Sequence, residues 1–253
     1  MDDLQLLMEL HRDAERQGPG GQAETRRAIE LSGLRHRQGL RIADIGCGTG
    51  ASTLVLAREL DAKIVAIDFL PEFLETLRQR ANRAGLSERI ATEAAAMDSL
   101  PLAPQALDAI WSEGAIYNIG FERGAREWRR FLKPGGILAV SELTWLTGRR
   151  PAEIELHWQT QYAEVGTASS KMAALERNGY SPLGYFVLPE HCWRDAYYRP
   201  LQKRFAAFLE AHGSSDAAKA VVADHAQEIE LYERYRAYFG YGFYIAQKTS
   251  DEL

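Results

Sequence analysis

The residues best suited to binding a ligand gather in the segment Asp44-Ile45-Gly46-Cys47-Gly48-Thr49-Gly50. An apolar run precedes it from residue 41, and residues 51–57 have the composition of a helix. A strand, a glycine-rich turn and a helix in this order begin a βαβ unit of the nucleotide-binding kind. The glycines allow a ligand to approach the main chain closely, and the first N–H groups of the helix face that ligand. The segment therefore predicts a nucleotide or nucleoside site.

Two classes of ligand fit this turn. Gly46-x-Gly48-x-x-Ala51 matches the dinucleotide fingerprint with alanine in its last place. Asp44, two residues before the first glycine, is expected to end the strand and to face the ligand crevice. Its carboxylate would repel a pyrophosphate there and would attract a ligand that carries an ammonium or a sulfonium. Asp44 therefore favours a cationic ligand over a dinucleotide.

The same residues resemble motif I of the class I S-adenosylmethionine (SAM) methyltransferases, (D/E)-x-G-x-G-x-G. Asp44, Gly46, Gly48 and Gly50 match it at every specified position. The resemblance implies SAM as the cofactor and S-adenosylhomocysteine (SAH) as its product, with Cys47 among the residues that surround it. Two alternatives stay open: an NAD(P)-dependent Rossmann oxidoreductase, and a SAM-binding module without transferase activity.

Further cofactor-binding residues follow the next two strands. Asp68 ends the apolar run 63–68, twenty residues after the second glycine of the turn, where a carboxylate that binds the ribose hydroxyls is expected. A ribose occurs in SAM and in NAD, so Asp68 does not separate them. Phe69 is expected to pack against ribose or adenine. In the resembled family an acid after the third strand binds the adenine amino group and its neighbour packs on the ring, which implies these roles for Asp98 and Met97.

Three more segments carry the resemblance. Small-molecule methyltransferases of this kind often begin with a helix and an RQGPG-like loop that covers the SAM site, here residues 16–20, which places Gln17 at the cofactor. Residues 112–124, SEGAIYNIGFERG, resemble prokaryotic methyltransferases for which we assign no substrate. The turn LKPGG at 132–136 is widespread in the superfamily.

Residues just beyond the carboxyl ends of parallel strands line the ligand crevice of such sheets. Glu113 lies at the end of the fourth strand and is a candidate for contacting the cofactor, orienting a substrate and removing its proton; capping a helix is its alternative role. His157 is a second candidate base, although a histidine beside a tryptophan more often packs. The candidate substrate-binding residues are Trp111, Tyr117, Asn118, Glu142, Trp145, Trp193 and Tyr197.

The composition argues against several classes of binding partner. The net charge is −5 and Lys and Arg are scattered, which argues against binding nucleic acid or an anionic membrane. His191 and Cys192 are adjacent, but no second pair at ligand spacing exists, so no metal is expected. No segment resembles a signal peptide or a membrane span, and two cysteines suit a reducing cytoplasm. The final residues 250–253, SDEL, resemble an ER-retention signal and are interpreted as a chance match.

The elements that must position these residues alternate between strand and helix. The expected strands are 41–45, 63–68, 89–95, 106–113, 137–142, 183–188 and 240–248. Class I methyltransferases insert the last strand antiparallel beside the fifth. The resemblance therefore implies an α/β fold with a Rossmann-like, doubly wound, mostly parallel sheet of seven strands, an antiparallel final strand and a helical substrate cap.

We expect one domain over residues 1–253. It comprises an N-terminal helical cap at 1–34, a SAM-binding core at 35–145, helical and aromatic substrate-side insertions at 148–238 and the last strand at 239–248. The expected reaction is in-line transfer of a methyl group to an O, N, S or C atom of a small molecule, by a monomer or homodimer.

Overall fold

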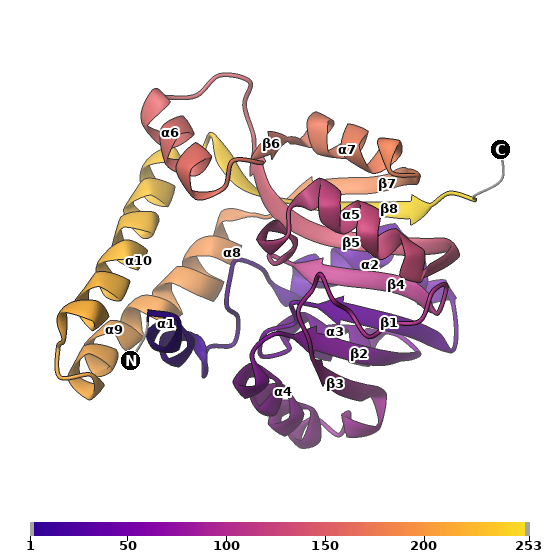
Figure 1. Ribbon diagram of the computed structural model, residues 1–253, viewed down its shortest axis with the longest axis horizontal. Coiled ribbons are helices and arrows are strands. Elements are labelled where there is room, and N and C mark those ends of the chain that lie inside the picture. The colour runs from indigo at the N-terminus through magenta and orange to yellow at the C-terminus, as the bar shows by residue number, and fades with distance from the viewer. Residues whose placement is uncertain (1–2, 251–253) are drawn as a thin grey trace.

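A computed structural model describes residues 3–250. Seven strands form one sheet in the order β3-β2-β1-β4-β5-β8-β7, and the short strand β6 pairs with β5 (Figure 1). The end of the ER-retention-like sequence, 251–253, lies outside the described residues. β1 to β5 pair in parallel, and β8 runs antiparallel to β5 and β7. The predicted mostly parallel sheet with an antiparallel final strand is confirmed.

The strands are β1 (Leu40–Ile45), β2 (Ala62–Asp68), β3 (Ile90–Ala94), β4 (Leu107–Glu113), β5 (Leu132–Trp145), β6 (Gly166–Thr167), β7 (Tyr180–Val187) and β8 (Phe239–Lys248). The helices are α1 (Asp3–His11), α2 (Gln22–Ser32), α3 (Ala51–Glu59), α4 (Pro71–Arg83), α5 (Phe121–Trp128), α6 (Ala152–Gln161), α7 (Ala168–Arg177), α8 (Glu190–Trp193), α9 (Arg199–Ala211) and α10 (Asp216–Tyr235).

Helices cover both faces of the sheet because its central strands are apolar on both sides. Successive residues of a strand point to opposite faces. Ile42 and Ile137 enter one hydrophobic core, which includes Ile29 of α2 and Leu56 of α3. Their neighbours Ala43 and Leu138 enter a second core, which includes Trp128 of α5 and Leu175 of α7. The near-continuous apolar runs of these strands thus reflect burial on two faces.

The cap, defined here as α1, α6, α8, α9 and α10, lies beyond the carboxyl ends of β1, β2 and β4 (Figure 1). α1 packs against α9 and α10, although about two hundred residues separate them in the sequence. A π-helical turn at Arg194–Tyr198 joins α8 to α9. Aromatic residues dominate this junction, and the Trp193 and Tyr232 rings stack at 4.6 Å between centroids.

Two predicted boundaries differ in the structure. α2 and α7 fall within segments that the sequence assigned to the cap, but both pack on the sheet layers, because their apolar faces enter the two cores described above. β5 extends three residues past its predicted end at Glu142, since β8 pairs with it as far as Trp145. Of the helices that the structure describes, none is long and apolar enough to cross a bilayer.

Gly50, at the start of α3, provides a test of the glycine turn. Its φ of +87° is unfavourable for other residues, and a Cβ there would lie 2.1 Å from Leu77 Cδ1. We expect Gly50→Ala to lower the free energy of unfolding by about 2–5 kcal/mol, from backbone strain and overpacking together. Gly33 has φ +68° but nothing within 4 Å of its Cβ position, so Gly33→Ala should cost only about 1–2 kcal/mol. Equal losses in urea unfolding would contradict this account.

Candidate cofactor and substrate site

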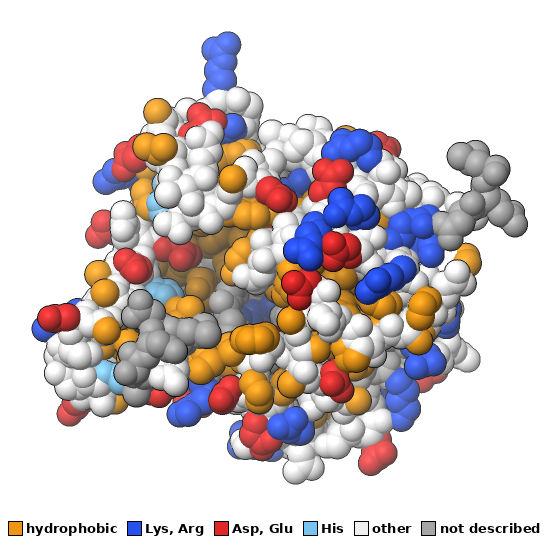
Figure 2. Space-filling view, viewed as in Figure 1, with side chains coloured by type: hydrophobic (Ala, Val, Ile, Leu, Met, Phe, Trp, Pro, Cys, Tyr) orange, Lys and Arg blue, Asp and Glu red, His pale blue; other side chains and the backbone are white. Residues whose placement is uncertain are grey.

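A cavity of about 640 Å³, the first cavity, opens between the cap and the carboxyl ends of β1, β2 and β4. It corresponds to the hollow between the cap helices and the sheet in Figure 2, where hydrophobic side chains form much of the wall. The glycine turn 46–48 and residues 67–70 line its sheet side. Tyr197, His225 and Glu228 line its cap side.

A second cavity of about 410 Å³ lies among α6, α8 and α10. The two cavities share part of their walls, and among the shared residues are Gly18, Tyr117, Tyr197, His225 and Glu228. A molecule in the second cavity therefore lies next to a molecule in the first. This arrangement provides adjoining chambers for a donor and an acceptor.

The loop at residues 16–20 packs over the glycine turn and forms hydrogen bonds with it. Gln17 Oε1 accepts a hydrogen bond from the Thr49 backbone N–H at 3.0 Å, and Gln17 Nε2 donates to Thr49 Oγ1 at 3.1 Å. Gly48 has φ +53°, and a Cβ there would lie 2.2 Å from Gln17 Oε1. Gln17, which the sequence places at the cofactor, therefore lines the first cavity and also fixes the turn.

Asp68 lies at the end of β2 with its carboxylate on the cavity wall. Its Oδ2 accepts a hydrogen bond from the Gly48 N–H at 2.8 Å, and its Oδ1 accepts one from the Leu70 N–H at 3.0 Å. Burial raises the pKa of Asp68, and these backbone donors oppose the rise. Each carboxylate oxygen has more than one acceptor site, so both can still bind hydroxyl groups of a ligand.

The other residues predicted to contact the cofactor also border the first cavity, with Gly50 and Asp44 as exceptions. Gly46, Cys47, Phe69, Met97 and Asp98 line it. Trp128 Nε1 donates a hydrogen bond to the Met97 carbonyl at 2.9 Å and so fixes the chain after β3. Gly50 lies behind the turn against Leu77 and does not border the cavity.

Asp44 does not face the cavity, contrary to the prediction. It is fully buried beneath the turn, where its Oδ2 accepts hydrogen bonds from Ser52 at 2.8 Å and Thr53 at 2.6 Å. Its Oδ1 is buried without a partner among the described residues. Burial raises the pKa of Asp44 to about 7, against the effect of the two hydroxyl donors. Asp44 therefore anchors the first turn of α3. The prediction that its carboxylate faces the ligand and repels a pyrophosphate is wrong.

Glu113 lines the first cavity but is already engaged by three donors. Arg16 Nη1 lies 2.8 Å from its Oε2, and the side chains of Thr25 and Trp111 donate to its Oε1 at 2.7 and 2.9 Å. The side chains of Arg16 and Glu113 are 8% and 6% exposed. Because these three donors occupy both carboxylate oxygens, Glu113 is poorly placed to contact a proton of a substrate.

Three predicted substrate contacts lie outside both cavities. Trp111 is buried in the sheet core, where it packs on Phe243. Glu142 lies inside β5 rather than at its end, fully buried, with Lys171 Nζ 3.9 Å from its Oε1. Trp145 is 5% exposed and stacks beneath the Arg150 guanidinium. Glu142 and Trp145 were misplaced because the pairing of β5 with β8 extends the strand.

The remaining predicted residues border a cavity. Tyr117 and Tyr197 line both cavities, Asn118 lines the first, and Trp193 and His157 line the second. Burial lowers the pKa of His157, and its ring packs edge-on against Trp158. The two tyrosines thus lie where the two chambers meet, whereas His157 lies on the wall of the second chamber.

Sequence reasoning missed a polar cluster where α1 meets α10. His225 Nδ1 lies 2.8 Å from the Val221 carbonyl, so it carries the proton, and His225 Nε2 lies 3.1 Å from His11 Nε2. Burial, and then the nearby His225 and Arg204, lower the pKa of His11 to about 3. Glu228 accepts a hydrogen bond from Tyr198 at 2.9 Å. Only the spacing of His225 and Glu228 on one helical face signals this cluster.

Comparison with known proteins agrees with this geometry. Residues 42–136 match a family model described as a methyltransferase domain. Methyltransferase GfsG of Streptomyces halstedii is 33% identical over 106 residues, which cover 42% of this chain and 38% of GfsG. The chain thus spans about two-fifths of the length of this relative. The uncharacterised protein YjhP of Escherichia coli strain K12 is 28% identical over 219 residues, which cover 83% of this chain and 86% of YjhP.

Solved structures extend the match over the whole fold. The YjhP crystal structure superposes with a TM-score of 0.82 at 24% identity and covers 97% of this chain and 100% of YjhP. A SAM-dependent methyltransferase from Geobacter sulfurreducens, solved with SAH, gives 0.81 at 20% identity and covers 96% and 97% of the two chains. Over residues 42–136 the chain thus matches a methyltransferase domain, and its fold is that of a solved SAM-dependent methyltransferase, in agreement with the family that motif I indicated.

The raised pKa of Asp44 predicts a pH-dependent stability. An unfolded aspartate has a pKa of about 4, whereas Asp44 in the fold has a pKa of about 7. Between these values the folded state keeps a proton that the unfolded chain has lost, so the free energy of unfolding falls as pH rises. We expect Asp44→Asn, whose carbonyl still accepts from Ser52 and Thr53, to gain stability relative to the wild type from about pH 4 to about pH 7.

This gain should level off above about pH 7, and urea unfolding at a series of pH values measures it. Asp61→Asn is the matched control, because Asp61 is exposed and accepts one backbone hydrogen bond, from Gly39. Parallel curves for wild type and Asp44→Asn would show that the carboxyl does not titrate in this range.

Proposed function

We propose that the protein transfers the methyl group of SAM, bound in the first cavity, to a small molecule bound in the second. The observation that carries this proposal is the shared wall between a nucleoside-type site and an aromatic chamber. Holding donor and acceptor in contact supplies much of the acceleration of such a transfer. When bound, SAM would supply a methyl group activated by its sulfonium, and the sulfur–methyl bond would break as the bond to the acceptor forms, with SAH as the leaving group.

The residues of the first cavity fit the cofactor. Asp68 presents carboxylate oxygens for the ribose hydroxyls, and Asp98 and Met97 are the proposed contacts for the adenine amino group and ring. Phe69, 65% exposed, offers a free aromatic face beside them. The carboxylates on this wall favour a ligand with cationic groups over one with a pyrophosphate. The match of residues 42–136 to a methyltransferase domain supports SAM over the dinucleotide alternative.

The walls of the second cavity indicate the kind of acceptor. They contain Trp158, Tyr162, Trp193 and Tyr241, together with the acids Asp224 and Glu228. Among the described residues that line it there is no lysine or arginine, and Arg16 of the first cavity is paired with Glu113. Aromatic faces and carboxylates bind neutral or cationic groups. We therefore propose a neutral or positively charged acceptor with an apolar body, rather than an anionic one.

Glu228 is the proposed proton acceptor for an acceptor atom that carries a proton, in place of Glu113 and His157. It lies on the wall shared by the two cavities. A neutral hydroxyl, that of Tyr198, holds it, whereas the charged Arg16 holds Glu113. Burial raises the pKa of Glu228, which brings a carboxylate closer to the basicity that general-base catalysis needs. The proton of the acceptor would pass to Glu228 as the new bond to the methyl carbon forms.

Two cysteines bear on the cellular setting of the reaction. Cys47 and Cys192 are both free and buried, as is usual where thiols stay reduced. This supports the cytoplasmic location that the sequence predicts. The predicted lack of nucleic-acid and membrane partners, and a monomeric or homodimeric state, remain predictions.

Calorimetric titration with SAH tests the cofactor site. We expect micromolar binding to the wild type and a loss of roughly tenfold to a hundredfold in Asp68→Ala, because hydrogen bonds to a carboxylate contribute about 1.5–3 kcal/mol. Asp61→Ala, which also removes a carboxylate bonded to a backbone N–H, should bind normally. Binding of NAD(H) in place of SAH would overturn the proposal. Tight SAH binding with no methyl transfer to any neutral or amine compound in a screen would favour the binding-module alternative.

Glu228→Gln tests the proposed base once the screen has identified an acceptor. We expect kcat to fall by about 10²–10⁴ with little change in KM or in SAH affinity. The wild-type kcat should rise with pH as Glu228 ionises, and the variant should lose this rise. Glu230→Gln, an exposed acid on the same helix α10, is the matched control. An unchanged kcat in Glu228→Gln would exclude it as the base.

A further inference from the structure

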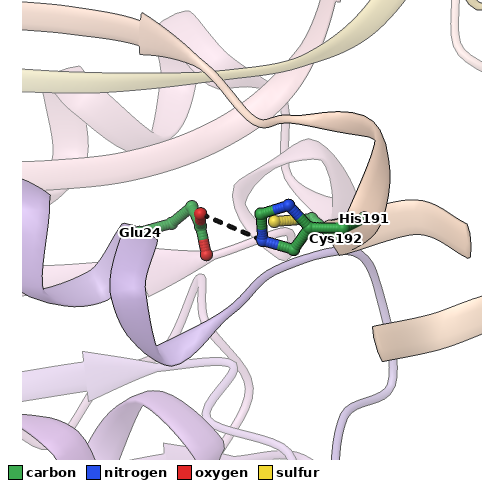
Figure 3. Close-up of side chains that lie close together, drawn as sticks. All are labelled: Glu24, His191 and Cys192. Carbon is green, nitrogen blue, oxygen red and sulfur yellow. Dashed lines mark ion pairs between the residues drawn. The ribbon is translucent and has the colours of Figure 1, made fainter. Parts of the chain in front are cut away.

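Three side chains with metal-binding atoms meet where α2 approaches α8, outside both cavities (Figure 3). They are Glu24, His191 and Cys192, and their ligand atoms all lie within 4.8 Å of one another. His191 Nε2 and Glu24 Oε1 are 3.2 Å apart. The histidine and cysteine are neighbours in sequence, whereas the glutamate comes from the far end of the chain, so only the fold brings the three together.

The Glu24 carboxylate carries an unexplained oxygen. The Glu24 side chain is 9% exposed, and its Oε2 is buried with no hydrogen-bond partner among the described residues. Burying a polar atom without a partner is costly, and such atoms in folded proteins are often explained by an ion. A Cβ at Gly21 would lie 2.1 Å from this oxygen and 3.5 Å from Cys192 Sγ. The absence of a side chain at Gly21 therefore lets the Glu24 carboxylate lie in this space, close to the Cys192 sulfur.

We propose that Glu24, His191 and Cys192 bind a divalent transition-metal ion, with zinc as the best match. One thiolate sulfur, one imidazole nitrogen and one carboxylate oxygen form a donor set that zinc accepts, whereas calcium and magnesium prefer oxygen alone. The His191 side chain is 53% exposed, so water can fill a fourth position on that side. This proposal does not depend on the proposed methyl transfer.

The donor set also matches the charge of a divalent ion. Zinc binds cysteine as the thiolate, so the Cys192 thiol must lose its proton when the ion binds. A bound metal replaces that proton, which is released to solvent, and the resulting thiolate and carboxylate together match a charge of +2.

The position of the site suggests a structural role. Glu24 is next to Thr25, which donates to Glu113 on the wall of the first cavity. Next to the site, the Cys192 carbonyl accepts a hydrogen bond from the Gly20 N–H at 3.4 Å. A metal here would therefore tie the start of α2 and the loop 16–20 to the cap helix α8. None of the three ligand residues lines either cavity, so the ion would not contact the acceptor.

Cobalt(II) titration of chelator-treated protein tests the site. We expect one Co²⁺ per chain, with thiolate-to-cobalt charge-transfer absorption and the visible bands of a four-coordinate ion, and displacement of both by Zn²⁺. Cys192→Ser should lose the charge-transfer absorption, and the isosteric Glu24→Gln should bind at least tenfold more weakly. No charge-transfer absorption in the wild type would overturn the proposal, as would an unchanged spectrum in Cys192→Ser.

Two controls make the outcome specific. His212→Gln removes another histidine paired with a glutamate, Glu9 at 3.1 Å, and should leave the spectrum unchanged; a loss there would indicate an adventitious ion only. Cys47→Ser removes the other cysteine of the chain and should keep the charge-transfer absorption. Zinc should also raise the melting temperature of the wild type but not of Glu24→Gln, and an equal rise in both would contradict the site.

Discussion

The buried ion pair between Arg16 and Glu113 is the contact on which the ligand site depends. It joins the loop after α1 to the carboxyl end of β4, and Thr25 adds the start of α2 to the same carboxylate. Breaking one partner of a buried pair leaves an uncompensated charge, which costs about 3–5 kcal/mol. The ion pair therefore keeps the loop at residues 16–20 over the glycine turn. Gln17 of the same loop holds the Thr49 backbone N–H of the turn.

This constraint separates two tasks that the cavities must perform. The sheet side, built from the ends of β1 and β2, is fixed by hydrogen bonds between neighbouring segments, as at Asp68. The cap side is built from helices that meet through aromatic rings. A cap of this kind can change its residues without disturbing the sheet, which is how one fold serves many acceptors.

Much of the sheet and of the cofactor side could be predicted, because both depend on local sequence. The position of Gly48 follows from the pattern of a strand and a glycine turn. The position of Asp68 follows from the pattern of an acid at the end of the next strand. The errors have non-local causes. The Asp44 side chain points beneath the glycine turn because two hydroxyl groups of α3 donate hydrogen bonds to it. Glu142 lies inside the sheet because pairing with β8 extends β5 beyond it. The His11–His225 pair spans 214 positions, beyond the range of any motif.

The place of β8 in the sheet has a consequence for how the chain reaches this fold. β8 is the last of the described strands in the sequence, yet it lies between β5 and β7 in the sheet and pairs with both. Until it is made, the ribosome-bound chain exposes two unpaired strand edges, which are sites for aggregation. The first five strands can assemble during synthesis, whereas β7 can join them only through β8. Sheet completion is therefore a late step that depends on long-range pairing.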